Sequence, residues 1–185
     1  MTDTTTPGPL LLCIDLQPIF LDAMPDKARL VKRCSFAIEA ARGLGLRVAF
    51  TEQVPQKLGT TDTVLLGLAG RPLQMAKTTF SALADHGIRD SLLQQHHADH
   101  LLICGLEVPV CIYQTAIDAL RAELPVTLLS DCLGARRPDD AAVVIDALQR
   151  AGVNVLPSET VFYSMMGDAA HPFFRTFTQL VKTYA

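Results

Sequence analysis

The sequence lacks the features that mark nucleic-acid-binding and membrane proteins. Its 16 lysines and arginines are outnumbered by 19 aspartates and glutamates, and the formal net charge is −3. Because no excess of positive charge is present, we expect neither a nucleic acid nor an anionic membrane as a partner. The longest apolar runs have the length of a strand, far below the ~20 residues of a membrane span. Residues 1–9 have no basic start and no long hydrophobic segment, so we expect a frayed terminal tail and no signal peptide.

The sequence also lacks the cysteine pattern of a disulfide framework or a zinc site. Its five cysteines are odd in number and contain no Cys-x-x-Cys spacing. Cys13, Cys104 and Cys132 fall in or beside predicted strands, where a thiol usually serves as a small buried apolar group. We therefore expect a reduced, cytoplasmic protein.

The pattern of apolar residues predicts a single α/β domain over residues 1–185. Hydrophobic residues make up 49% of the sequence and the mean hydropathy is +0.26, which suits a sheet covered on both faces. Six strands alternate with helices, and this order favours a three-layer α-β-α fold with an open, mostly parallel, Rossmann-like six-stranded sheet. The expected strands are 10–14, 46–51, a short one within 72–79, 101–104, 126–129 and 153–156. The expected helices are 26–42, a short one within 63–68, 88–97, one from about 108 onward, 138–150, and one or two closing helices.

One cysteine stands apart from the strands. The apolar run 101–104 breaks at Gly105, and a helical pattern begins near Val108, so Cys111 falls at or near a helix N-terminus. There the helix dipole lowers the pKa of a thiol, and free backbone N–H groups can hold an oxyanion. We therefore predict that Cys111 is a nucleophile with a lowered pKa.

Two charged residues also end predicted strands. Asp15 follows the first strand and Lys77 follows the third, and ligands of such sheets bind beyond the carboxyl ends of the strands where strand order reverses. If strands one and four are neighbours at that point, Asp15 meets Cys111. Asp15 could then accept the thiol proton, and Lys77 could hold the carboxylate and favour the thiolate. The residues alone also allow a capping aspartate, a solvated lysine and a packed thiol.

Three short stretches carry a resemblance that favours the first alternative. Residues 15–17 (Asp-Leu-Gln), 77–81 (Lys-Thr-Thr-Phe-Ser) and 105–111 (Gly-Leu-Glu-Val-Pro-Val-Cys) resemble the three signatures of the isochorismatase-like cysteine hydrolase family. Their order and spacing match over nearly the whole chain. Residues 51–59 and 167–172 further resemble the branch called isochorismatase domain-containing proteins. The resemblance implies the isochorismatase-like hydrolase fold. It also implies a homo-oligomer, because members of the family are commonly oligomeric.

The resemblance also implies roles for individual residues. In the family an aspartate, a lysine and a cysteine form a triad, which maps onto Asp15, Lys77 and Cys111. A non-proline cis peptide ahead of the cysteine maps onto the bond between Leu106 and Glu107, and would turn a backbone N–H toward the oxyanion together with the amide of Cys111. The expected activity is hydrolysis of a small amide-like C–N substrate. The thiolate attacks the carbonyl, Asp15 passes the proton to the leaving amine, and water then hydrolyses the thioester.

No metal and no other cofactor is expected. Nicotinamidases of the same superfamily carry an Asp-x-His motif after the second strand, whereas Glu52 and Gln53 stand there in this sequence. Three histidines precede the fourth strand, at the sheet end opposite the expected site, and we interpret them as a solvated helix end: His96, His97 and His100. Our candidates for the wall of the substrate pocket are Gln17, Phe20, Gln53 and Tyr113.

Two other functions remain compatible with the sequence. The chain could be a catalytically weak or silent family member that acts as an oligomeric binding or scaffold protein. Cys111 could instead be a redox thiol, although no resolving cysteine stands at a suitable spacing. The aromatic C-terminal segment from Phe162 to Phe177 covers either a partner subunit or the chain's own sheet. The sequence does not identify the substrate.

Overall fold

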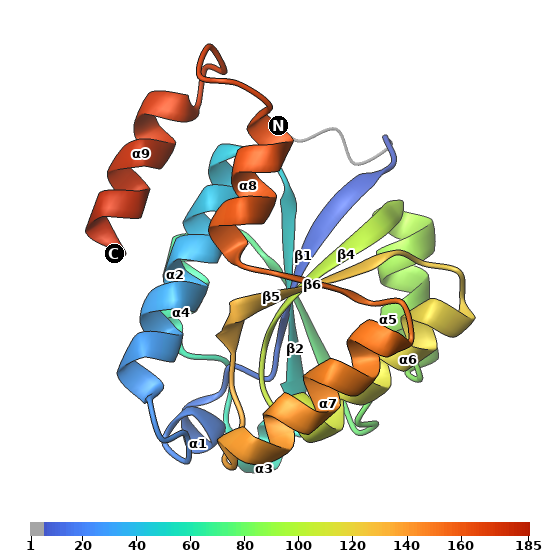
Figure 1. The fold of residues 1–185 in the computed structure, drawn as a ribbon. Coiled ribbons are helices and arrows are strands. Elements are labelled where there is room, and N and C mark those ends of the chain that lie inside the picture. Colours follow the sequence, from blue (N-terminus) through green and yellow to red (C-terminus); the bar gives the residue numbers. More distant parts are fainter. Residues whose placement is uncertain (1–5) are drawn as a thin grey trace.

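The computed structural model describes residues 6–185 and confirms the predicted α/β class (Figure 1). The sheet has the order β3-β2-β1-β4-β5-β6, and every pair of neighbouring strands is parallel. Its strands are β1 Gly8–Ile14, β2 Arg47–Gln53, β3 Leu73–Lys77, β4 Ala98–Gly105, β5 Val126–Leu133 and β6 Asn154–Leu156. Most of the predicted tail lies outside the described residues. Its last two residues, Gly8 and Pro9, already pair with β4, so the strand starts earlier than we predicted.

Helices cover both faces of the sheet, as the three-layer prediction requires. One face carries α2, α4, α8 and α9, and the other carries α5, η1, η2, α6 and α7, where η1 and η2 are π-helical turns (Figure 1). The helical segments are α1 Pro18–Leu21, α2 Lys27–Gly43, α3 Pro55–Leu58, α4 Thr63–Ala69, α5 His86–Asp90, η1 Ser91–Gln95, η2 Val108–Ile112, α6 Tyr113–Arg121, α7 Pro138–Arg150, α8 Ser158–Met166 and α9 Phe174–Thr183.

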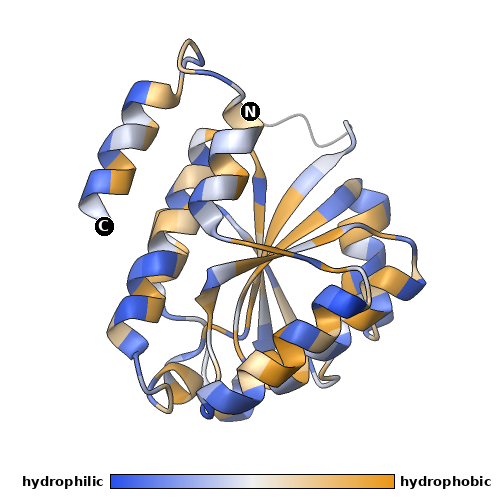
Figure 2. Cartoon of the chain, viewed as in Figure 1, coloured by the Kyte–Doolittle hydropathy of each residue, from blue (hydrophilic) through white to orange (hydrophobic). Residues whose placement is uncertain are grey.

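The apolar pattern of the sequence accounts for these layers. Figure 2 shows hydrophobic residues concentrated along the central strands, whereas the helices carry both hydrophobic and hydrophilic residues. β1 and β4 are buried along most of their length because helices pack on both of their faces. The long helix α2 begins where the Asp26 side chain accepts a hydrogen bond from the Arg29 amide, which satisfies a free N–H of the first turn.

The strand order reverses at the centre of the sheet, between β1 and β4. From β1 the chain moves outward through β2 to β3, and it then returns to β4 on the other side of β1. The carboxyl ends of β1 and β4 are held together because the Leu106 amide donates a hydrogen bond of 2.8 Å to the Ile14 carbonyl. The turns that follow these two strands therefore lie side by side, which is where the topology places a ligand site.

The C-terminal helices pack on the chain's own helix α2. Phe162 of α8 and Phe177 of α9 are fully buried against Phe36 of α2, with ring centroids 6.1 and 5.5 Å from it. On the same face, Arg33 joins α2 to the sheet, because its guanidinium forms an ion pair of 2.7 Å with Asp131 of β5. The aromatic segment thus covers this face of its own subunit. The expected oligomer stays a prediction.

The cysteines behave largely as expected. All five are free and buried, and Cys13, Cys34, Cys104 and Cys132 belong to the core on the α2 side of the sheet. Cys111 alone belongs to the core on the other side. Within residues 6–185, no helix is both long enough and apolar enough to span a membrane.

Candidate active site

Asp15 lies in the turn immediately after β1. Its φ of 53° is in the left-handed region, which aspartate tolerates better than most residues do. The side chain is only 1% exposed, and its Oδ1 accepts a hydrogen bond of 2.9 Å from Thr51 Oγ1 on the neighbouring strand β2. Because Ile14 and Thr51 are paired in the sheet, the register of β1 and β2 fixes the direction of the carboxylate.

Lys77 is the last residue of β3 and is 2% exposed. Its ammonium group lies 2.7 Å from Asp15 Oδ2 and 2.5 Å from Gln53 Oε1. It also lies 3.3 Å from the carbonyl oxygen of Thr79. A buried ammonium requires such partners because burial removes its hydration. The turn after β1, the end of β2 and the turn after β3 therefore hold the charged end of Lys77 in place.

Cys111 lies in η2, just after the sharp turn that ends β4. The turn depends on Gly105, whose φ is +120° and whose added Cβ would lie only 2.1 Å from the Ile14 carbonyl oxygen. The helical segment then starts at Val108, with Pro109 in its first turn. Cys111 is 7% exposed, and its Sγ lies 3.7 Å from Lys77 Nζ.

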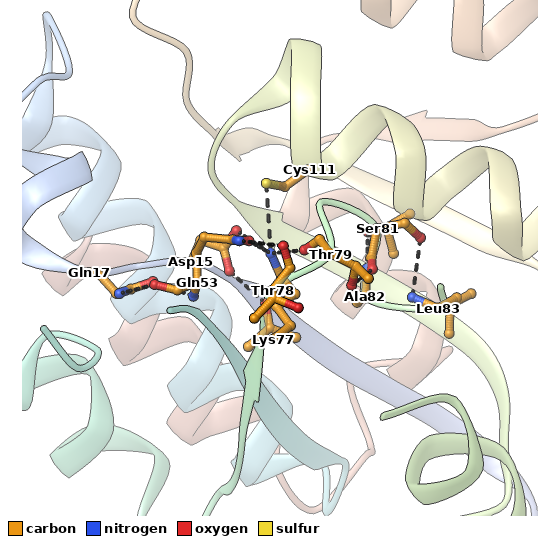
Figure 3. A network of polar contacts seen from close by, with 12 residues as sticks. Asp15, Gln17, Gln53, Lys77, Thr78, Thr79, Ser81, Ala82, Leu83 and Cys111 are labelled. Carbon is orange, nitrogen blue, oxygen red and sulfur yellow. Dashed lines mark hydrogen bonds and ion pairs between the residues drawn. The ribbon is translucent and has the colours of Figure 1, made fainter. Parts of the chain in front are cut away.

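The three predicted side chains therefore meet at one point, as Figure 3 shows. Asp15 comes from β1, Lys77 from β3, and Cys111 from the helical segment after β4. The negative charge of the Asp15 carboxyl also acts on the Cys111 thiol and helps to raise its pKa. The alternative of a solvated lysine does not hold, because Lys77 is buried and paired. The arrangement places an acid and a thiol beside one shared cation.

The prediction of a lowered thiol pKa is wrong. Burial, followed by the negative charge of Asp15, raises the pKa of Cys111 to about 12. The positive charge of Lys77 and the amide of Glu107 act in the opposite direction but do not compensate. The helix argument failed because it omitted the loss of hydration at a nearly closed site. Burial also raises the pKa of Asp15, and this effect outweighs the attraction to Lys77.

The expected cis peptide between Leu106 and Glu107 is also contradicted, because the described chain contains no cis bond. Trans is the low-energy form of a non-proline peptide bond. The neighbouring backbone amides form hydrogen bonds with this bond in the trans form. The Leu106 amide donates to the Ile14 carbonyl, and the Val108 amide donates to the Gly134 carbonyl at 3.1 Å.

The four candidate pocket residues have different positions. Gln17 is fully buried and ties the turn after β1 to the following loop, because its amide group bonds the backbone of Gln53 and the Gly59 carbonyl. Gln53 lies in the site, but as a partner of Lys77. Phe20 packs against the core on the α2 side of the sheet, whereas Cys111 packs on the other side. Tyr113 is 37% exposed, two residues after Cys111. Substrate contact by any of them stays a prediction.

Sequence reasoning missed several residues that support the site. Thr51 orients Asp15, and Thr79 contributes its carbonyl oxygen to Lys77. Thr115 of α6 accepts a hydrogen bond of 3.0 Å from the Ala82 amide, which fixes the turn after Lys77 to the helix after Cys111. Of these three residues, only Thr51 could have been found from the sequence, because it pairs with Ile14 once β1 and β2 are aligned in register. In the part of the chain that the structure describes, no group of three or more metal-binding side chains is present.

The model of the Isochorismatase domain family matches residues 9–160. The chain belongs to this family. The match includes the ends of β1, β3 and β4, and therefore all three residues of the site. The family assignment places the chain in the isochorismatase-like hydrolase superfamily, and it confirms the resemblance that the three short motifs carry.

Named relatives agree with the family assignment. Isochorismatase domain-containing protein 2 of Pongo abelii is 33% identical over 173 residues, which are 94% of this chain and 82% of that protein. Isochorismatase domain-containing protein 1 of Salmo salar is 30% identical over 190 residues, covering the whole of this chain and 66% of that protein. Among solved structures, the MAR1 ribonuclease of Caenorhabditis elegans superimposes with a TM-score of 0.87 at 26% identity, over 94% of this chain and 89% of that one.

Proposed function

We propose that this family member is a cysteine hydrolase that cleaves a small amide-like C–N substrate through a thioester on Cys111. The observation that carries the proposal is the contact of one ammonium group with both other members of the site. Lys77 Nζ lies 2.7 Å from Asp15 Oδ2 and 3.7 Å from Cys111 Sγ. A nucleophile, a base and a cation in this arrangement are the components that acyl transfer requires.

The first step follows from the two raised pKa values. At neutral pH the proton resides on the Cys111 sulfur, because burial and the negative charge of Asp15 hold it there. As the sulfur attacks the substrate carbonyl carbon, Asp15 accepts this proton and a C–S bond forms. Lys77 stabilises the negative charge that develops on the sulfur. The enzyme thus keeps a neutral thiol at rest and generates the thiolate only during attack.

The remaining steps reuse the same groups. The carbonyl oxygen becomes an oxyanion, for which the amide of Cys111 is the proposed donor. Protonated Asp15 gives its proton to the leaving nitrogen, the C–N bond breaks, and an amine or ammonia departs. Asp15 then removes a proton from water, and the resulting hydroxide attacks the thioester carbon. The C–S bond breaks, the acid leaves, and Asp15 returns its proton to the Cys111 sulfur. No external oxidant or reductant enters this sequence.

The enclosure of the site favours a small substrate. Only 7% of Cys111 is exposed, and the loop after β2 is fastened beside the site by the side chains of Gln17 and Glu52. Glu52 Oε1 accepts a hydrogen bond of 2.8 Å from the Thr61 amide. A rigid, mostly closed site excludes water, which strengthens the electrostatic effect of Lys77.

The proposal is tested with a panel of small amides, ureido compounds and esters, each assayed for release of ammonia, amine or alcohol. We expect at least one member to be hydrolysed by the wild type and not by Cys111→Ala. A hydrolytic activity that survives in Cys111→Ala would contradict the proposal. So would a panel in which no compound is cleaved while Cys111 of the folded protein remains accessible to small alkylating reagents.

A specific observation favours a second candidate, the oligomeric binding or scaffold protein. A thiol with a pKa of about 12 is mostly protonated at neutral pH, as expected for a site without turnover. Iodoacetamide labelling distinguishes the two functions. Selective modification of Cys111 supports the hydrolase, and equally slow labelling of all five cysteines supports the scaffold. Because one structural relative is named a ribonuclease, RNA belongs in the substrate panel, although the net charge of −3 does not favour it.

A further inference from the structure

A second cavity lies at the other end of the sheet from the site described above. It has a volume of about 300 Å³ and lies where β1, β2 and β3 begin. Asp15, by contrast, directly follows the last residue of β1, and Lys77 is the last residue of β3. The seven residues of β2 rise about 3.3 Å each, so roughly 20 Å separates the two ends. The cavity is therefore distinct from the Cys111 site.

Three arginines and a histidine line this cavity. Arg42 lies at the end of α2, Arg47 begins β2, Arg71 precedes β3 and His96 precedes β4. None of the residues that line the cavity is acidic. Within residues 6–185, moreover, none of the three arginines forms an ion pair. Among the described residues, positive charge thus gathers around one hollow without an ion-pair partner for any of the three arginines.

Two of the three guanidinium groups form hydrogen bonds to the backbone, and one of these two has a nitrogen without a partner. Arg47 Nη2 donates a hydrogen bond of 3.0 Å to the Gly8 carbonyl, whereas its Nη1 is buried and has no hydrogen-bond partner in the described chain. Arg42 donates to the Leu68 carbonyl, and an added Cβ on Gly70 would lie 3.4 Å from its Cζ. A buried guanidinium nitrogen without a partner is unusual, because buried polar groups are nearly always hydrogen-bonded.

The rest of the lining is apolar. Leu46, Pro72 and Leu73 are partly exposed apolar side chains beside the arginines, and Leu73 begins β3. A simple phosphate or sulfate ion would use only the arginines and leave these surfaces unoccupied. The combination of a cationic rim with an apolar wall fits an amphipathic anion, and the volume lies at the lower end of the range of small-molecule pockets.

We propose that this hollow, the arginine cavity lined by Arg42, Arg47, Arg71 and His96, binds a small organic anion with a phosphate or carboxylate head and an apolar body. The head accepts hydrogen bonds from the guanidinium groups of Arg42 and Arg71, which are exposed, and lies close to the partly buried guanidinium of Arg47. The apolar body lies against Leu46, Pro72 and Leu73. The proposal does not depend on the hydrolase activity, because it uses no residue of the Cys111 site.

Phenyl phosphate is the probe, and calorimetric titration at about 50 mM salt measures its binding, since low salt screens the arginines least. Inorganic phosphate and phenol supply the head and the body alone. We expect phenyl phosphate to bind more tightly than either, and Arg71→Gln to weaken its binding about tenfold, the loss of one charge-assisted contact. The double variant Arg42→Gln/Arg71→Gln should weaken binding further. Arg89→Gln, which removes an exposed arginine outside the cavity, is the matched control and should bind like the wild type.

A second measurement removes dependence on the variants. In the wild type, the side-chain Nε–Hε NMR signal of Arg47 should shift on addition of phenyl phosphate. Cys111→Ala should bind the probe as the wild type does, which shows that the probe is not in the catalytic site. The proposal is overturned if the double variant and Arg89→Gln bind equally well, if inorganic phosphate or phenol alone binds as tightly as phenyl phosphate, or if no saturable binding occurs.

Discussion

Replacement of Lys77 by methionine should destabilise the protein strongly and in a pH-dependent way. Methionine has a similar length and no charge, so Lys77→Met leaves the Asp15 carboxylate buried, 1% exposed, without its cation. Removal of one partner from a buried ion pair costs about 3–5 kcal/mol of unfolding free energy. Thr51 remains as a hydrogen-bond donor to Asp15 and places the loss toward the lower end of that range.

The pH dependence follows from the direction of the Asp15 shift. Burial already raises the pKa of Asp15 above its unfolded value, so the folded protein holds this proton more tightly than the unfolded chain does. The associated stability is present at low pH and is lost as the pH rises through the folded pKa. Without Lys77 the folded pKa rises further. The variant should therefore differ least from the wild type near pH 4 and most near pH 8.

Urea unfolding at these two pH values, with Asp15→Asn/Lys77→Met as the matched control, checks the prediction. The double variant has no buried charge to leave unpaired, so it should recover much of the stability lost at pH 8 and show little of the pH dependence. A single variant that is as stable as the double variant at pH 8, or that loses the same free energy at both pH values, would refute the account of the Asp15 and Lys77 pair.

Three further predictions concern the same region. Asp15→Asn should abolish turnover of any substrate but accelerate alkylation of Cys111 by iodoacetamide at pH 8, because the negative charge that helps to raise the thiol pKa is gone; slower alkylation would contradict this. Alkylation of Cys111 in the wild type should accelerate about tenfold per pH unit between pH 7 and pH 10, since the thiolate fraction rises toward a pKa of about 12, and a plateau below pH 9 would be inconsistent with that pKa. Gly105→Ala should lower the unfolding free energy by about 3 kcal/mol or more in urea titrations, because its Cβ would lie 2.1 Å from the Ile14 carbonyl oxygen, and a loss below about 1 kcal/mol would contradict the close approach.

The parts of the site that depend on topology could be predicted from the sequence. Asp15, Lys77 and the Gly105 turn each follow an apolar run, and parallel strands bring such ends to one edge of a sheet. The strand order that makes β1 and β4 neighbours then joins Asp15 to Cys111. These relations need only the periodicity of the chain and the rules of α/β folds, so the expected and observed positions agree.

The parts that depend on burial could not be predicted. The helix position of Cys111 gave the wrong direction for its pKa, because the loss of hydration depends on how completely neighbouring loops close over the thiol. Gln53 was expected in the pocket wall, and its role beside Lys77 requires knowledge of side-chain direction at the end of β2. The arginine cavity had no local signal either, since Arg42 and Arg71 are far apart in the sequence.

Intact-mass spectrometry of acid-quenched reactions tests the central claim most directly. The wild type is mixed with activated small amides and esters, quenched within seconds, and digested to locate any acyl group. We predict a mass increase equal to the acyl group, confined to the peptide that contains Cys111, and its absence in Cys111→Ala. Continued hydrolysis by Cys111→Ala at the wild-type rate, or an acyl group found only on another residue, would contradict a thioester mechanism.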